Sequence, residues 1–193
     1  MKTAVFLYNP ESGKGKIARN VGCISTIFQA YGYDVTPQKI DFTANPFDGN
    51  ETIDLMVVAG GDGTVNYVVN AMKRKGLDIP IGVIPAGTAN DFAGMLGVRG
   101  DISRACRAIL DGEDQRVDLG VAGGERFVNV FSCGLFTDVS QKTPTVLKNN
   151  FGKLAYYFGG LGELPNFRKM HITIRSEEVD YDCLLYTSDA ADD

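Results

Sequence analysis

The sequence lacks the residues that several common kinds of site require. It has one histidine, His171, and none of its four cysteines lies close enough to another to form a Cys-x-x-Cys pair. A Ser-His-Asp triad and a zinc site rich in histidine or cysteine are therefore not expected. Because the chain does not look secreted, we expect its cysteines to be free and mostly buried thiols: Cys23, Cys106, Cys133 and Cys183.

Two further absences concern the surroundings of the protein. No apolar run approaches the roughly 20 residues that cross a bilayer. The formal net charge of −5 lacks the basic excess typical of nucleic-acid-binding domains. The first residues, MKTAVFLYNP, are too short in their apolar stretch for a signal peptide and continue directly into a glycine-rich loop. These features predict a cytoplasmic protein with no nucleic-acid partner and no transmembrane segment.

The chain does contain a regular alternation of apolar and amphipathic segments. Short apolar runs, typical of parallel strands buried on both faces, occupy residues 3–8, 53–59 and 79–84. Apolar residues at helical spacing mark helices over 17–31, after the glycines at 60–63, and over 102–110, where Asp101 or Ser103 is the expected cap. This alternation predicts an α/β fold, a three-layer domain with a parallel sheet between helices.

The pattern changes near residue 116. Period-two alternation around Gly123-Gly124 predicts a hairpin. Farther along the chain, residues 146–163 are expected to be helical and 170–175 extended. In the first part of the chain, residues 43–52 are expected to form a loop. We assign residues 1–115 to a nucleotide-binding α/β domain and 116–182 to a partial, β-rich second domain. The end, CLLYTSDAADD at 183–193, fits neither domain and resembles a sequencing artefact, so we expect it to be foreign to the protein.

Three of the expected strands end in glycine-bearing turns: NPESGKG (9–15), GGDGT (60–64) and PAGTAN (85–90). Ligands of open α/β sheets bind beyond the carboxyl ends of the strands, so the three turns are expected to converge on one site. In GGDGT, glycines let successive N–H groups form an anion-binding nest at a helix start, and Thr64 is expected either to cap that helix or to offer its hydroxyl to phosphate. A plain tight turn is the alternative.

Asp62 is an anion in the middle of this phosphate-type loop. Mg²⁺ is usually held by one or two carboxylates together with waters and substrate phosphates. Asp62 is therefore intelligible as a metal ligand that faces a nucleotide through Mg²⁺, as phosphoryl transfer requires.

The two flanking loops are less specific taken alone. Gly13, Gly15 and Ala18 match the dinucleotide pattern GxGxxA, but an insertion separates them from the strand, and no Walker A motif is present. Lys14 remains available for phosphates, with a solvated basic turn as the alternative. In the third loop Gly87 permits a close approach, and Thr88 and Asn90 offer hydrogen bonds; capping of the next helix by Asn90 or Asp91 is the alternative.

Taken in order, NPESGKGK, AGGDGTVN and IPAGTANDFA resemble the diacylglycerol kinase catalytic domain of bacterial lipid kinases. VDLG at 117–120, FVNVFSCGLFTDVS at 127–140 and GKLAY at 152–156 extend the resemblance to roughly residues 3–175. GGDGT alone is shared with NAD kinases and other phosphofructokinase-like folds, whereas GTANDFA points to lipid kinases.

The resemblance implies a phosphofructokinase-like α/β domain, the start of a β-sandwich domain, and ATP and Mg²⁺ as cofactors. It implies transfer of the γ-phosphoryl of ATP to a lipid hydroxyl, most simply that of diacylglycerol, at a membrane surface. The implied nucleotide contacts are Asn9, Ser12, Gly13, Gly60, Gly61, Asp62, Gly63, Thr64, Asn66 and Thr88. The implied acidic-basic network near the phosphates comprises Asp62, Asp91, Asp118 and Lys14.

Some features depart from the family pattern or stay open. Gly94 stands where the family often has arginine, and Thr43 is a weak match to a threonine that the family uses for ATP. The family's general base and structural Mg²⁺ site lie later than residue 182, so we expect the chain alone to be incomplete for catalysis. An NAD kinase and a nucleotide-binding fragment without activity are the alternatives. The lipid acceptor and the oligomeric state, a homodimer included, are left open.

Overall fold

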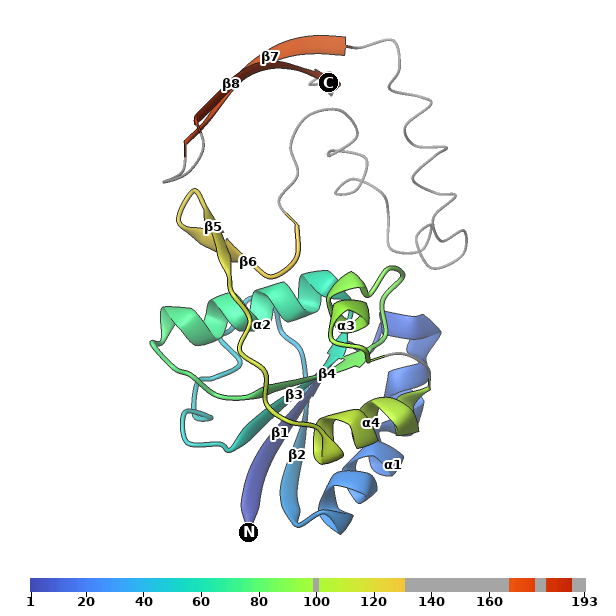
Figure 1. The fold of residues 1–193 in the computed structure, drawn as a ribbon. Helices are drawn as coiled ribbons and strands as arrows, with labels where there is room; N and C mark the ends of the chain where they lie inside the picture. Colours follow the sequence, from blue (N-terminus) through green and yellow to red (C-terminus); the bar gives the residue numbers. More distant parts are fainter. Residues whose placement is uncertain (99–100, 131–166, 176–179, 189–193) are drawn as a thin grey trace. The chain divides into compact units, whose positions relative to one another are not determined.

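The computed structural model describes residues 1–98, 101–130, 167–175 and 180–188. The chain divides into two compact units, residues 1–131 and 132–193. The first unit holds a four-stranded sheet in the order β2-β1-β3-β4, and every neighbouring pair of strands is parallel (Figure 1). The strands are β1 (Lys2–Tyr8), β2 (Tyr33–Lys39), β3 (Leu55–Gly60) and β4 (Ile81–Pro85). The predicted parallel α/β sheet is confirmed.

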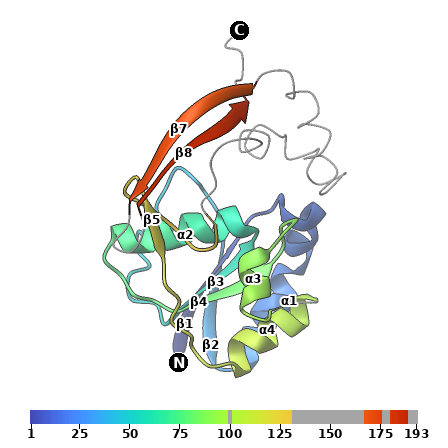
Figure 2. The same cartoon turned by 45° about the horizontal axis from the view of Figure 1, so that its top comes forward.

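Helices cover both faces of this sheet (Figures 1 and 2). Successive strand residues point to opposite faces, so Val5 and Leu7 join one buried cluster while Ala4 and Phe6 join the other. The first cluster contains α2 and α3, and the second contains α1 and α4. The helical segments are η1 (Ser12–Gly15), α1 (Lys16–Ala30), α2 (Asp62–Arg74), α3 (Asp91–Met95) and α4 (Ile102–Asp111).

The edge strand β2 was not predicted. Only Val35 of its seven residues is buried, so it lacks the continuous apolar run that revealed β3. Pro37 also argues against a strand when the sequence is taken alone, yet an edge strand tolerates proline because one side of it makes no ladder bonds. The predicted helix 17–31 and the helix cap at Asp101 are confirmed, since the Asp101 side chain accepts a hydrogen bond from the Arg104 N–H at 2.8 Å. The predicted helix over 146–163 lies outside the described residues.

The predicted hairpin is also present, as β5 (Gly120–Ala122) and β6 (Glu125–Phe127) joined through Gly123 and Gly124. Both glycines have positive φ, of 58° and 86°, which a two-residue hairpin turn requires. The hairpin lies in the first compact unit, although the sequence places it in a second domain that starts at residue 116. That domain assignment stays a prediction.

The second unit contributes one described element, an antiparallel pair of strands. β7 (Phe167–Arg175) pairs with β8 (Asp180–Ser188), which confirms the extended conformation predicted for 170–175. His171 Nε2 lies 2.5 Å from Asp182 Oδ1 across this pair. Residues 183–188 lie in β8, and the foreign origin that we expect for 183–193 stays a prediction.

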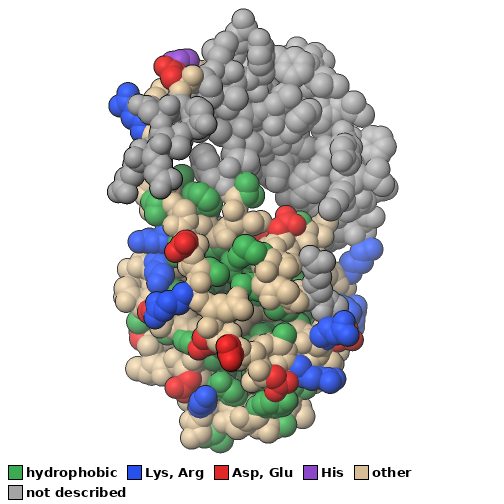
Figure 3. All heavy atoms as spheres, in the orientation of Figure 1, with side chains coloured by type: hydrophobic (Ala, Val, Ile, Leu, Met, Phe, Trp, Pro, Cys, Tyr) green, Lys and Arg blue, Asp and Glu red, His purple; other side chains and the backbone are tan. Residues whose placement is uncertain are grey.

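The surface of the described residues carries charges of both signs. Acidic and basic side chains are interspersed on the face shown in Figure 3. Among the helices that the structure describes, none is long and apolar enough to cross a membrane.

The β5–β6 hairpin is fastened to α2 by Asn70, which is buried. The Asn70 amide nitrogen donates to the Arg126 carbonyl at 2.8 Å, and its oxygen accepts from the Arg126 N–H at 2.9 Å. The side chain thus pairs with the backbone of β6 as a neighbouring strand would. Because Asn70 interrupts the run of apolar residues in α2, a buried polar anchor explains why it stands there.

Asn70→Ala is expected to lower the free energy of unfolding by about 1–3 kcal/mol, because it leaves the backbone groups of Arg126 unpaired. Amide hydrogen exchange should accelerate at Arg126. Asn20→Ala is the control, since the Asn20 side chain bonds only within its own helix, to the Lys16 carbonyl. Equal protection of Arg126 in the wild type and in Asn70→Ala would contradict the anchoring role.

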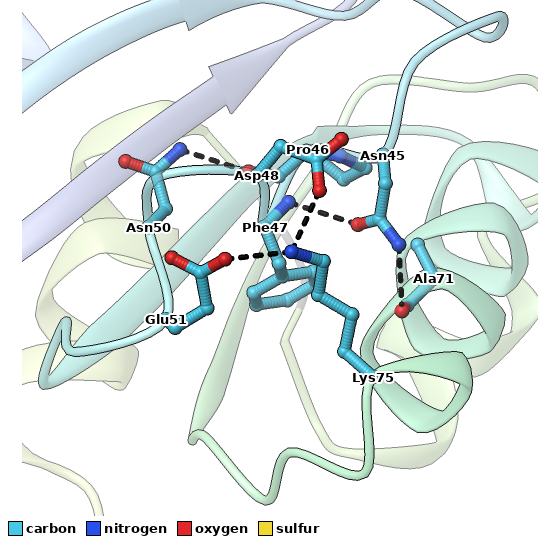
Figure 4. A network of polar contacts seen from close by, with 8 residues as sticks. All are labelled: Asn45, Pro46, Phe47, Asp48, Asn50, Glu51, Ala71 and Lys75. Atoms are coloured by element: carbon cyan, nitrogen blue, oxygen red, sulfur yellow. Dashed lines mark hydrogen bonds and ion pairs between the residues drawn. The ribbon is translucent and has the colours of Figure 1, made fainter.

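The loop between β2 and β3 is held along one face of α2. The Tyr67 hydroxyl donates to the Ala44 carbonyl at 2.5 Å, and the Asn45 amide donates to the Ala71 carbonyl at 3.1 Å. One helical turn further, Lys75 lies 2.6 Å from both Asp48 and Glu51 (Figure 4). Four-residue spacing places Tyr67, Ala71 and the C-cap residue Lys75 on one face of α2. Together with the fully buried side chain of Phe47, these contacts hold the β2–β3 loop in a fixed position against α2.

The Lys75 ion pairs make the stability of the attachment of this loop to α2 depend on pH. The hydrogen bond from Lys75 lowers the pKa of Glu51 below its ordinary value. The contribution to stability is therefore fully present above the ordinary pKa of about 4.3 and is lost as the pH falls through the lowered pKa. We expect Lys75→Met to destabilise the chain at pH 6, and the difference from the wild type to shrink toward pH 3. Urea unfolding across this range measures it, with Lys39→Met, an exposed lysine of β2, as the control.

Candidate functional site

The loops that follow β1, β3 and β4 leave the same edge of the sheet and contact one another. The Ala86 N–H donates to the Gly60 carbonyl at 2.9 Å, and the Asn9 N–H donates to the Ala59 carbonyl at 3.1 Å. Both bonds prolong the strand pairing by one residue beyond the regular ladder. The three loops predicted to converge are therefore brought together.

Glycines permit this contact between loops. A Cβ on Gly87 would lie 2.5 Å from the Cα of Gly61, and a Cβ on Gly61 would lie 3.1 Å from the Cα of Gly87. On the other side, a Cβ on Gly13 would lie 3.4 Å from the Ala86 carbonyl oxygen, and φ of Gly13 is +60°. Larger residues at Gly61 and Gly87 would separate the second and third loops, so these two glycines fix the spacing of the site.

The first loop contains a left-handed turn. Gly13, Lys14 and Gly15 have φ of 60°, 55° and 73°. Glycine adopts this conformation freely, but at Lys14 it costs roughly 1–2 kcal/mol. Non-glycine residues held in this region cluster at functional sites. Asn9 shapes the start of the loop, because its side-chain oxygen accepts from the Glu11 N–H at 3.0 Å and its carbonyl accepts from the Ser12 N–H at 3.1 Å.

The N-terminus of α2 is free of a side-chain cap. The helix begins at Asp62 with Gly61 as its N-cap and no side-chain cap, so of the two roles expected for Thr64 the capping role is wrong. Thr64 is the third helical residue and is buried, and its side chain lies where a Cβ on Gly60 would be, within 2.7 Å. The first-turn N–H groups of a helix that no side chain caps form a ready anion site. Gly63 is exposed, and a Cβ there would meet no atom within 4 Å, so the space above this turn is open.

Asp62 makes one contact that the sequence did not reveal. Its Oδ1 accepts a hydrogen bond from the Phe92 N–H at 3.0 Å, so this carboxylate caps α3 from another loop. The alternative in which Asn90 or Asp91 only caps α3 is not found, because Asn90 is left-handed, with φ of 54°, and its amide turns back to Gly87. Asn90 Oδ1 accepts from the Gly87 N–H at 2.7 Å, and its amide nitrogen donates to the Gly87 carbonyl at 2.8 Å. Asp62 is thereby held at the meeting point of the second and third loops.

The donor set suits a cation that is shared with a bound phosphate. Among the described residues there is no group of three or more histidine, cysteine or acidic side chains placed to enclose a metal. One fixed carboxylate beside an anion site is nevertheless the protein contribution that Mg²⁺ usually takes. In the second turn of α2, Asn66 Oδ1 is buried and has no hydrogen-bond partner in the structure. A buried polar atom of this kind calls for a partner, and a polar ligand would supply one.

Three of the remaining predicted residues lie in the glycine-bearing loops or directly after them, whereas Asp118 lies two residues after Arg116, which pairs with Asp78 before β4. Thr88, Asp91 and Lys14 are exposed in their loops, and Asp118 is exposed in the segment before β5. In the part of the chain that the structure describes, no ion pair joins Lys14 to Asp62, Asp91 or Asp118, so the predicted acidic-basic network stays a prediction. A cavity of about 500 Å³ adjoins α3, lined by Pro85, Ala89, Asn90, Asp91, Gly94, Met95 and Val98.

Comparison with known proteins gives this arrangement its context. The family model described as the diacylglycerol kinase catalytic domain matches residues 3–122. A diacylglycerol kinase of Bacillus subtilis (strain 168) is 33% identical over 192 residues, covering 96% of this chain and 62% of that protein. A diacylglycerol kinase of Staphylococcus aureus (strain MRSA252) is 34% identical over 194 residues, covering 98% of this chain and 60% of that protein.

Solved structures agree with these relatives. The crystal structure of a diacylglycerol kinase from Bacillus anthracis str. Sterne matches with a TM-score of 0.69 and 25% identity, covering 95% of this chain and 61% of the other. Another structure from the same organism matches with a TM-score of 0.75 and 27% identity. The chain thus spans about three fifths of the length of the relatives that it matches. On the family match and these identities, the chain belongs to the diacylglycerol kinase catalytic domain family.

Proposed function

We propose that the chain carries the nucleotide-binding part of an ATP- and Mg²⁺-dependent lipid kinase, which transfers the γ-phosphoryl of ATP to the hydroxyl of diacylglycerol. The observation that carries this proposal is the convergence of three strand-end loops around a helix N-terminus that no side chain caps, with Asp62 fixed beside it. Family membership supports a lipid kinase over the NAD kinase alternative.

The chain's own residues would act by binding and orienting the nucleotide. The first-turn N–H groups of α2 and the left-handed turn at residues 13–15 would donate to phosphate oxygens. Lys14 would add a positive charge, and Asn66 Oδ1 would find a partner in the bound nucleotide. Asp62 would hold Mg²⁺, which when bound neutralises charge on the phosphates. Positioning and charge neutralisation of this kind account for most of phosphoryl-transfer catalysis.

The acceptor would reach the site from the side of the third loop. Asp91 is exposed there and lines the cavity beside α3, with Met95 supplying apolar surface. Asp91 and Asp118 would complete the acidic-basic network near the transferred phosphoryl. The general base would come from outside the described residues. A lipid acceptor also implies work at a membrane surface by a cytoplasmic, peripherally bound protein, and a homodimer is compatible with this arrangement.

The experiment separates the alternatives by their products. The chain, and a fusion of it to the C-terminal part of the Bacillus subtilis relative, are incubated with Mg²⁺, γ-labelled ATP, and diacylglycerol in mixed micelles or NAD in solution. We expect labelled phosphatidic acid from the fusion and no labelled NADP. Labelled NADP without labelled lipid would overturn the proposal. Stabilisation of the fusion by Mg-ATP without any turnover would contradict the kinase activity and favour the alternative of a nucleotide-binding fragment without activity.

A further inference from the structure

An aromatic pair beside the nucleotide site has no role in the proposed phosphate chemistry. Phe42, in the loop after β2, is 52% exposed although it is a large apolar side chain. Its ring contacts the ring of Tyr67 on α2 edge-on, with the centroids 5.1 Å apart and the planes at 69°. Tyr67 supports one side of the Phe42 ring, so a further flat ring is free to pack against what remains exposed.

The loop holds Phe42 in place on both sides. Before it, the Ile40 N–H donates to the Tyr8 carbonyl at 2.9 Å. After it, the Thr43 N–H and hydroxyl donate to the Asp41 carboxylate at 2.8 and 2.6 Å. The Tyr67 hydroxyl binds the loop again at the Ala44 carbonyl. The backbone around Phe42 is thus fixed before any ligand arrives, which reduces the entropy that binding would cost.

The position of the pair relates it to the nucleotide site. The bond from Ile40 to Tyr8 places the start of this loop next to Asn9, where the first phosphate-type loop begins. Tyr67 follows Asp62 by five residues in α2, which is about 7.5 Å along the helix axis. Phosphates bound at the first turn of α2 would leave the rest of the nucleotide to extend beyond that turn, and the exposed Phe42 ring packs on Tyr67 in the second turn of the same helix.

We propose that Phe42, supported by Tyr67, is the stacking platform for the base of the bound nucleotide. This rests on the proposed function, since it assumes that the phosphates bind at the start of α2. Stacking of a base on an aromatic side chain is sequence-tolerant and substantial, so its loss should weaken nucleotide binding by roughly 10-fold or more. Ligands without a base should be unaffected.

The test compares Mg-ATP with Mg-tripolyphosphate, which has the phosphates but no base, by isothermal titration calorimetry. We expect Phe42→Ala to bind Mg-ATP at least about 10-fold more weakly than the wild type and tripolyphosphate equally well, while Phe42→Tyr binds both normally. Tyr31→Ala is the control, because Tyr31 is similarly exposed but lies at the end of α1. Equal losses for both ligands, or no loss for ATP, would overturn the platform.

A second variant keeps the ring and adds a signal. The chain has no tryptophan, so Phe42→Trp would report on this position alone. We expect Mg-ATP to quench its fluorescence and tripolyphosphate to leave it unchanged; fluorescence that ignores saturating Mg-ATP would overturn the platform. If the wild type binds tripolyphosphate as tightly as ATP, the platform fails and the phosphate site stands. If it binds neither ligand, the proposed function itself fails.

Discussion

Gly63→Ala is expected to stabilise the chain and, at the same time, to weaken Mg-ATP binding by about 100-fold. Gly63 is the second residue of α2, its φ is not positive, and an added Cβ would meet no atom of the protein within 4 Å. Alanine in a helix is favoured over glycine by roughly 0.5–1 kcal/mol. The methyl group would therefore fit the protein but occupy the open space where we propose that the phosphates lie.

The opposite signs of the two effects make this variant informative. Unfolding in urea measures the stability, and calorimetry measures the affinity for Mg-ATP. Gly22→Ala is a matched control, because Gly22 is also exposed, lies within α1 and has no atom within 4 Å of an added Cβ. It should stabilise the chain without changing the affinity. If Gly63→Ala binds Mg-ATP as the wild type does, the phosphates do not lie on this helix end.

Sequence patterns predicted those parts of the fold that local residues determine. β3 is buried along its whole length, so its continuous apolar run predicted it, and the glycine-bearing turns predicted where the strands end. β2 was not predicted, because this edge strand buries only Val35 and therefore has no apolar run, and because it contains Pro37, which an edge strand tolerates. The hairpin was predicted from Gly123 and Gly124, but its anchor at Asn70 was not, because the partner of Asn70 lies 56 residues away.

The site divides in the same way. Its location was predicted, since three glycine-bearing turns followed parallel strands. The cap of α4 at Asp101 was predicted, but the cap of α3 was not, because capping rules consider neighbours in sequence whereas this cap comes from Asp62, thirty residues earlier. Thr64 looked like a cap by position, yet its side chain fills the space left by Gly60. The position of Phe42 depends on its contact with Tyr67 in α2, and a contact between residues so far apart in sequence cannot be predicted from periodicity.

Asp62 caps α3, and we propose that it also holds Mg²⁺; one pair of variants can separate the observed role from the proposed one. Asp62→Asn keeps an oxygen that can accept from the Phe92 N–H but removes the charge that Mg²⁺ requires. Asp62→Ala removes both. We expect Asp62→Ala to lose about 1 kcal/mol of stability, as loss of a helix cap does, and Asp62→Asn to remain close to the wild type.

Both variants should lose the Mg²⁺-dependent part of ATP binding, and the fusion protein carrying either of them should lose activity by about 100- to 1000-fold, the scale of a removed electrostatic contact in a phosphoryl-transfer site. Calorimetry of ATP with and without Mg²⁺ measures the first effect directly. If Mg²⁺ strengthens ATP binding to Asp62→Asn as much as to the wild type, the metal role is wrong. Asp62 would then serve only to join the second and third loops through the cap of α3, and the cation would have to be held by the nucleotide and by residues other than this carboxylate.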